Sequence, residues 1–350
     1  PQTDWRRVVE LVQCSRAMDA IEERELVPGK KIFYQFSARG HDMAQVLLGL
    51  HLTHPKDAVC GYYRSRPVLL SLGVALEDAL GSAMGRAGGY SDGRDIGVVF
   101  NYPNANGASA LPMCGGVGAQ YTPTAGYAQA IEYHKNVLGD RAYDGAIGVV
   151  LGGDASVATN GFWAALTMAT TLKLPMLFYI EDNGLGISVK GEMQTPGGNI
   201  AENLASFKHL FVRDGDGTNP HEASGLLEEV VAHVRAGNGP ALIRLTVPRL
   251  SSHSGPDNQK GYRTASEISS DERRDPLPKL KKYLVPALLS ESNWASVEAD
   301  VAHDVEHALR AARARPVADA AQIGRFVLSL IHISEPTRLR RISYAVFCLK

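Results

Sequence analysis

The stretch GGDASVATNGFWAALTMATTLKLPMLFYIEDNG, residues 152–184, places Asp154 directly after two glycines and Asn183 twenty-nine residues later, before another glycine. The apolar run AIGVVLGG at 146–153 shows no alternation, which is typical of a parallel strand buried on both faces. Phe162, Leu166, Ala169 and Leu172 then recur at helical spacing, and PMLFYIED at 175–182 predicts a second strand. The stretch therefore predicts a strand, a helix and a strand that form one βαβ unit.

The same pattern continues on both sides of this unit. FVRDGDG at 211–217 is followed by a helical pattern over 220–236 and by PALIRLTV at 240–247, and IGVVF at 96–100 predicts a further strand. We therefore expect an α/β fold with a mainly parallel open sheet flanked by helices. Residues 1–60 predict an N-terminal helical layer, residues 61–275 the α/β domain, and residues 276–326 C-terminal helices.

The composition excludes several classes of protein. The chain has 350 residues, 45% of them hydrophobic, and a formal charge of -1, so we expect neither nucleic-acid binding nor attachment to a membrane surface through a basic field. The four cysteines are scattered and form no CxxC pair, which favours a reducing compartment, with the cytoplasm as the default. No run of eighteen apolar residues occurs, so we expect no membrane span.

Asp154 and Asn183 each follow a predicted strand. The carboxyl ends of parallel strands share one edge of the sheet, so the two side chains can reach one point if the strands lie side by side. A carboxylate and a carboxamide oxygen are hard ligands that suit Mg²⁺. Asp and Asn are also common at strand ends as turn or capping residues, so spacing alone leaves both interpretations open.

Several motifs in order resemble one known family over residues 37–262. GDA followed by DNG resembles the thiamine diphosphate motif, and TLKLPMLFYIEDNGLGIS at 171–188 resembles the alpha chain of the 2-oxoacid dehydrogenases. Two departures occur, because Asp182 replaces the usual first Asn and Leu185 the usual aromatic residue. The resemblance implies a thiamine diphosphate-binding fold with thiamine diphosphate and Mg²⁺ as cofactors.

The resemblance also implies roles for individual residues. Asp154, Asn183 and the backbone carbonyl of Leu185 would bind Mg²⁺. By position, Gly153, Ala155 and Ser156 would face the cofactor diphosphate. Tyr63 and Arg64 of CGYYRSRP would also contact the diphosphate, and Gly116 and Val117 of LPMCGGVGAQ would line the thiazolium. Arg suits phosphate because it offers planar, bidentate donors.

The polar segment RLSSHSGPDNQKGYR at 249–263 resembles the flexible active-site loop of the family, so His253 is the implied catalytic histidine, in contact with the cofactor. The near-neutral pKa of histidine suits proton transfer. Ser254 occupies a place that is phosphorylated in some eukaryotic relatives. SARGHD at 37–42 resembles an early family segment, but we assign His41 no chemistry and expect a capping or packing role.

The implied activity is oxidative decarboxylation of a 2-oxoacid, a branched-chain 2-oxoacid before pyruvate, with acyl transfer to a lipoyl-bearing acyltransferase. A beta chain, or a fused beta half, would complete the site, so we expect this chain alone to be inactive. The alternatives are an acetoin dehydrogenase alpha chain and a non-catalytic assembly subunit of the same fold. Residues 327–350 resemble translated sequencing adapter, with an ordinary basic tail as the other interpretation.

Overall fold

The computed structural model describes residues 3–95, 97, 99–322 and 324. Within this part, a six-stranded sheet has the order β2-β1-β3-β4-β8-β7, and every neighbouring pair is parallel. Its strands are β1 (Ala58–Cys60), β2 (Ser109–Ala110), β3 (Gly148–Gly153), β4 (Met176–Asp182), β7 (Phe211–Asp216) and β8 (Ala241–Thr246). A small antiparallel hairpin joins β5 (Leu185–Gly186) to β6 (Val189–Lys190). The expected α/β architecture is confirmed.

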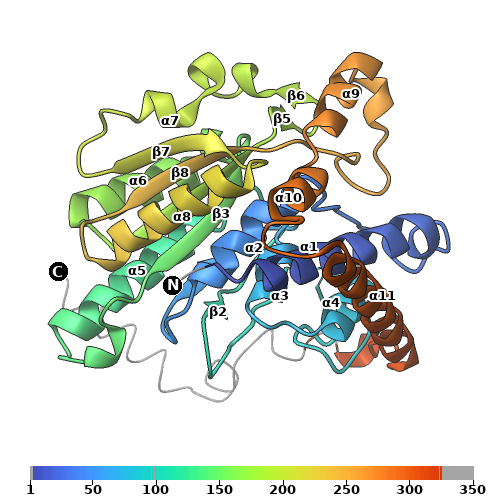
Figure 1. Cartoon of the computed structure of the whole chain (residues 1–350). Coiled ribbons are helices and arrows are strands. Elements are labelled where there is room, and N and C mark those ends of the chain that lie inside the picture. Colours follow the sequence, from blue (N-terminus) through green and yellow to red (C-terminus); the bar gives the residue numbers. More distant parts are fainter. Residues whose placement is uncertain (1–2, 96, 98, 323, 325–350) are drawn as a thin grey trace.

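Helices cover both faces of this sheet (Figure 1). The α-helices are α1 (Trp5–Ile21), α2 (Asp42–His51), α3 (Arg66–Ser71), α4 (Leu76–Ala83), α5 (Tyr121–Asn136), α6 (Asn160–Leu172), α7 (Ile200–Asn203), α8 (Pro220–Arg235), α9 (Ala265–Arg273), α10 (Pro276–Leu284) and α11 (Glu291–Ala314). A π-helical turn, Glu22–Leu26, extends α1. Short 3-10 turns lie at Arg141–Tyr143, Ser156–Ala158, Gly191–Met193, Pro196–Gly198, Gln259–Gly261 and Ala320–Gln322.

Alternating side chains of the central strands enter two apolar clusters. On one face, Val150 and Phe178 pack with residues of α5 and α6. On the other face, Val149 and Tyr179 belong to a larger cluster that also contains residues of α1, α2, α8 and α11. Burial on both faces explains why these strands are continuously apolar. The division of the chain at residues 60, 275 and 326 remains a prediction.

The predicted βαβ unit forms as β3, α6 and β4. The two strands are direct neighbours, with Gly153 opposite Glu181, so residues 154 and 183 leave the sheet at the same edge. Phe162, Leu166 and Ala169 are buried as expected. Leu172, placed on the same helix face by its spacing, is the last residue of α6 and is half exposed.

Two other expectations are wrong. The described residues of IGVVF, which are Gly97, Val99 and Phe100, are not in a strand: Val99 and Phe100 are buried in irregular backbone, and residues 96 and 98 lie outside the described residues. The outer strand is instead the two-residue β2. The polar composition of residues 249–274 predicts a loop throughout, but Thr264 and Glu267 form a capping box that starts α9 at Ala265. The tail at 327–350, with Cys348, lies outside the described residues.

Candidate functional site

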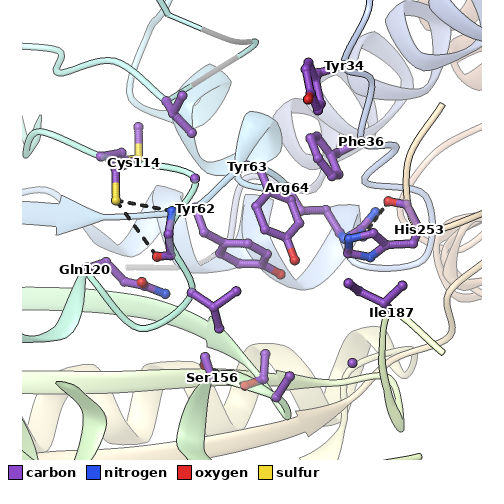
Figure 2. A pocket seen from close by; sticks show the side chains of 18 of the residues that line it. Tyr34, Phe36, Tyr62, Tyr63, Arg64, Cys114, Gln120, Ser156, Ile187 and His253 are labelled. Atoms are coloured by element: carbon purple, nitrogen blue, oxygen red, sulfur yellow. Dashed lines mark hydrogen bonds between the residues drawn. The ribbon is translucent and has the colours of Figure 1, made fainter. Parts of the chain in front are cut away.

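A cavity of about 830 Å³ opens at the carboxyl ends of β3 and β4. Figure 2 shows Tyr34, Phe36 and Tyr63 on one side of it, Ser156 on the opposite side, and Cys114 and Gln120 at one end. All eleven residues nominated from the sequence line this cavity: Tyr63, Arg64, Gly116, Val117, Gly153, Asp154, Ala155, Ser156, Asn183, Leu185 and His253. The fold thus gathers residues separated by up to 190 positions in the sequence, from Tyr63 to His253, around one space.

Asp154 is buried at the wall of the cavity, with 6% of its surface exposed. Its Oδ2 atom has no hydrogen-bond partner among the described residues. Burial, followed by the nearby charge of Asp182, raises the pKa of Asp154 to about 7. A buried carboxylate oxygen without a partner is unfavourable, and a bound cation would satisfy it.

Asn183 and Leu185 form a tight turn beside Asp154. The backbone N–H of Leu185 donates to Asn183 Oδ1 at 3.1 Å, and both residues line the cavity. A carboxylate, an amide oxygen and a backbone carbonyl are suitable ligands for Mg²⁺, which usually keeps several waters or phosphate oxygens besides. No group of three His, Cys, Asp or Glu residues suited to a metal occurs in the described part of the chain. The three candidate Mg²⁺ ligands include only one residue of these four types, Asp154, because the other two oxygens belong to the Asn183 amide and the Leu185 backbone.

The departure at Asp182 has a structural partner. Its Oδ2 accepts a hydrogen bond from Arg244 Nε at 2.7 Å, and its Oδ1 accepts one from the Gly184 backbone at 2.9 Å. Arg244 also contacts Asp214 at 2.8 Å. The extra carboxylate therefore belongs to an ion-pair chain that runs across β4, β8 and β7, and it also accepts from the backbone of the turn at Gly184.

Arg64 is buried and faces the cavity beside Tyr63. Its guanidinium donates to the backbone oxygen of Ser37 at 2.5 Å. It also donates to the backbone oxygen of His253 at 3.1 Å (Figure 2). Opposite, Ser156 Oγ donates to the Gly153 carbonyl at 2.6 Å. A cationic fork on one wall and a glycine-containing turn with a hydroxyl on the other are groups that can bind a diphosphate.

The residues nominated for the thiazolium, Gly116 and Val117, lie in the loop before α5. Val117 is 56% exposed, and the backbone N–H of Gly116 donates to Cys114 Sγ at 3.3 Å. This loop lies at the rim of the cavity, and the exposed apolar side chain of Val117 is accessible to a ligand.

His253 stands edge-on to two aromatic rings, with ring centroids 5.6 Å from Phe36 and 5.7 Å from Tyr63. Burial, together with the positive charges of Arg64 and Arg249, lowers the pKa of His253 to about 4. The imidazole is therefore neutral at pH 7 and offers both a proton donor and a proton acceptor.

The loop around His253 is held by its own side chains. Asp257 accepts from the His253 backbone at 2.8 Å and from the Tyr262 hydroxyl at 2.5 Å, while Arg249 donates to the same hydroxyl at 2.7 Å. Arg263 pairs with Asp271 of α9 at 2.6 Å. The motif residues RLSSHSGPDNQKGYR thus hold the loop that places His253 in the cavity.

Other residues of the cavity were not nominated. Tyr34, Phe36 and Gln194 line it without belonging to a quoted motif, whereas Tyr62 and Gln120 lie within CGYYRSRP and LPMCGGVGAQ but were given no role. The only sequence signal for the first two is the aromatic density of FYQF at 33–36. His41 was expected to cap or pack: it makes no side-chain cap among the described residues but is fully buried, and its ring lies 3.3 Å from the Asn183 amide nitrogen.

A parallel sheet with buried polar groups at the carboxyl ends of neighbouring central strands fits an α/β thiamine diphosphate-binding fold. The family model described as "Dehydrogenase E1 component" matches residues 10–321. The chain belongs to the dehydrogenase E1 component family, as an alpha chain of a 2-oxoacid dehydrogenase.

Individual relatives agree with this family. The pyruvate dehydrogenase E1 component subunit alpha of Zymomonas mobilis is 28% identical over 286 residues, which is 79% of this chain and 75% of the relative. The 2-oxoisovalerate dehydrogenase subunit alpha of Bacillus subtilis is 28% identical, over 73% of this chain and 74% of the relative. The mitochondrial pyruvate dehydrogenase E1 component subunit alpha-2 of Arabidopsis thaliana is 26% identical, over 91% of this chain and 77% of the relative.

Among the described residues, no helix is both long and apolar enough to cross a membrane.

Proposed function

We propose that this chain provides the diphosphate and Mg²⁺ half of a thiamine diphosphate site in a 2-oxoacid dehydrogenase. The observation that carries the proposal is the buried Oδ2 of Asp154, which has no hydrogen-bond partner among the described residues, at a residue that lines one cavity with Arg64, Ser156 and Asn183. Asp154, Asn183 and the Leu185 carbonyl would hold Mg²⁺. Arg64 and Tyr63 would hold the diphosphate together with Gly153, Ala155 and Ser156, while Gly116 and Val117 would line the thiazolium.

Thiamine diphosphate, when bound, supplies the carbanion chemistry by which a 2-oxoacid loses carbon dioxide. His253 then acts as the acid–base group of the chain, because its neutral ring can donate a proton from one nitrogen or accept one at the other. Phe36 and Tyr63 pack against this ring in T-shaped geometry and would limit its rotation.

The complete reaction requires partners. We propose a beta chain, or a fused beta half, that completes the cofactor site, and a lipoyl-bearing acyltransferase that receives the acyl group. The chain alone is then inactive. The scattered cysteines still predict a reducing compartment, with the cytoplasm as the default. We do not include phosphorylation of Ser254 in the proposal.

A branched-chain 2-oxoacid is the first proposed substrate and pyruvate the second. The relatives named above include subunits of both enzyme kinds at 28% identity, which supports either one. One methylene group changes binding by only about 1 to 3 kcal/mol, so small differences in the pocket decide the preference.

The test begins with calorimetry of thiamine diphosphate on the purified chain, with and without Mg²⁺. Saturable binding that requires Mg²⁺ is expected, and Asp154→Ala should abolish it. The chain is then mixed with a beta chain of the same family, both cofactors and an artificial electron acceptor. Turnover of 3-methyl-2-oxobutanoate or pyruvate supports the proposal. Turnover of acetoin alone identifies an acetoin dehydrogenase chain, and binding without any turnover identifies an assembly subunit.

A further inference from the structure

A buried polar chain connects the metal-site turn to the first residues of α2. His41 is the residue immediately before α2, and its side chain is 1% exposed. The ring Nε2 lies 3.3 Å from Asn183 Nδ2, and the ring Nδ1 lies 3.4 Å from Glu181 Oε2. The imidazole therefore stands between a carboxyl group and the side-chain amide of a proposed Mg²⁺ ligand.

The backbone directs His41 inward. Gly40 has a φ of 96°, and a Cβ atom there would lie 2.0 Å from the Pro248 carbonyl oxygen. Only glycine fits this close approach. The turn is thus built to pack against the segment after β8, which brings His41 towards the end of β4.

The two contacts of the Asn183 amide fix its orientation. Its oxygen accepts from the Leu185 backbone at 3.1 Å, so its nitrogen faces His41. An amide nitrogen only donates, and therefore His41 Nε2 must be the acceptor and carry no proton. In a neutral ring the proton then sits on Nδ1, which lies 3.4 Å from Glu181 Oε2 and has no hydrogen-bond partner among the described residues.

Glu181 is fully buried and holds further groups of the site. Its Oε2 accepts from Gln45 Nε2 at 2.9 Å and from the Tyr62 hydroxyl at 2.7 Å. Gln45 Nε2 also donates to the Arg64 carbonyl at 3.2 Å. The same carboxyl group thus connects the turn that carries Tyr63 and Arg64 with the turn that carries Asn183.

We propose that His41 is a positioning residue for the cation site: backed by Glu181, it holds the Asn183 amide so that the oxygen stays on the side of Leu185. Leu185, whose carbonyl is the third proposed ligand, belongs to the same turn and lines the same cavity. This inference rests on the proposed Mg²⁺ half-site. Groups that orient a metal ligand through a hydrogen bond typically change metal affinity about 10- to 100-fold when they are removed.

A comparison of four full-length proteins tests the proposal: the wild-type chain, His41→Leu, Asn183→Asp and the double variant. Calorimetry measures Mg²⁺ affinity at saturating thiamine diphosphate. His41→Leu should weaken Mg²⁺ binding about 10- to 100-fold in the wild-type background. In the Asn183→Asp background it should change affinity less than about threefold, because a carboxylate has two equivalent oxygens and needs no orientation.

His41→Gln is the conservative variant, since its side-chain oxygen can accept from the Asn183 amide. It should retain Mg²⁺ affinity within about threefold of wild type and thermal stability near wild type. Equal losses for His41→Leu in both backgrounds, or full affinity in His41→Leu, would overturn the positioning role. Failure of the wild-type chain to bind Mg²⁺ and thiamine diphosphate at all would instead remove the proposed half-site, and this inference with it.

A second measurement needs no destabilising substitution. Nitrogen-15 NMR of the wild-type chain distinguishes the tautomers of its eleven histidines, and the His41 signal is assigned by its loss in His41→Gln. A neutral ring with its proton on Nδ1 is expected. A proton on Nε2 would exclude the hydrogen bond from Asn183 and overturn the proposal, whatever the affinities are.

Discussion

The guanidinium of Arg64 donates a hydrogen bond to the backbone oxygen of His253 at 3.1 Å. The residue proposed to bind the diphosphate therefore also holds the loop that carries the proposed acid–base histidine. The other branch of the same guanidinium donates to Ser37, so one buried cation joins three segments distant in the sequence. A change at Arg64 should then be felt in the loop even when no cofactor is present.

The first prediction concerns this connection. Arg64→Met should increase amide hydrogen exchange across residues 251–257 in the chain alone, because hydrogen bonds to a charged group contribute about 1.5 to 3 kcal/mol each. The same change should weaken thiamine diphosphate binding by a factor of about 10 to 100, since the cationic fork is lost. Hydrogen exchange read by mass spectrometry and calorimetry measure the two effects.

Arg213→Met is the matched control, because Arg213 lies on β7 and pairs with the exposed Glu229 of α8. It should leave exchange in the loop unchanged. Unaltered loop protection in Arg64→Met would show that Asp257 and Tyr262 hold the loop without help from Arg64.

The second prediction concerns the stability of the chain without ligands. Asp154→Asn should raise the free energy of unfolding by about 1 to 3 kcal/mol at pH 8, because it removes a buried charge whose Oδ2 has no partner among the described residues. The pKa of Asp154 is raised to about 7, so the folded state holds its proton more tightly than the unfolded state. The unfavourable charge is therefore present above pH 7 and fades below it.

Urea denaturation at pH 8 and pH 6 measures this effect, and the gain should be larger at pH 8. Asp300→Asn, on the exposed face of α11, is the control and should change stability by less than about 0.5 kcal/mol. A loss of stability in Asp154→Asn at pH 8 would mean that the apo chain satisfies this carboxylate in some other way.

The third prediction follows from the depressed pKa of His253. The unfolded chain takes up a proton on this residue below about pH 6.5, whereas the folded chain does so only near a pKa of about 4. The stability associated with the neutral ring is therefore present above pH 6.5 and is lost as the pH falls from there to about 4. His253→Gln should lose less thermal stability between pH 7 and pH 4.5 than the wild-type chain.

Differential scanning calorimetry at the two pH values checks this difference. His303→Gln, at an exposed position of α11, provides the control and should follow the wild-type profile. If His253→Gln also follows the wild-type profile, the ring is solvated and its pKa is not depressed.

The parts predicted correctly from the sequence are those with a regular pattern. Buried parallel strands are continuously apolar, and Phe162 and Leu166 repeat at helical spacing, so β3, α6 and β4 could be placed within two residues at each boundary. IGVVF shows the limit of this pattern. Val99 and Phe100 are buried although their backbone is irregular, so an apolar run alone does not distinguish a strand from a buried irregular segment.

The supporting groups of the site had no such signal. We propose that His41 acts on Asn183, which is 142 residues away in the sequence, and the turn before His41 packs against Pro248. Contacts between residues so far apart produce no regular spacing that a sequence could show. Tyr34 and Gln194 likewise reach the cavity through tertiary packing alone. Residues that contact a cofactor can be carried over from a motif, whereas residues that orient those contacts depend on the three-dimensional arrangement.

The last prediction concerns the first glycine of GGDAS. A Cβ atom on Gly152 would lie 2.0 Å from Tyr121 Oη and 2.4 Å from Ser156 Oγ, two atoms that are themselves 2.6 Å apart. Ser156 Oγ donates to Gly153, so the Tyr121 hydroxyl must donate to Ser156 and cannot move away without breaking that bond. Tyr121 is fully buried against Phe162, which blocks any shift of the ring.

Gly152→Ala should therefore lower the free energy of unfolding by about 3 kcal/mol, at the upper end of the usual cost of overpacking a core. It should also weaken Mg²⁺-dependent binding of thiamine diphosphate, because Ser156 must move from the diphosphate wall. Gly153→Ala is the matched control: its Cβ would meet only the Glu181 carbonyl oxygen at 3.5 Å, an ordinary contact. Urea denaturation of the two variants should separate them clearly, and equal stabilities would mean that Tyr121 and Ser156 can rearrange around the added methyl group.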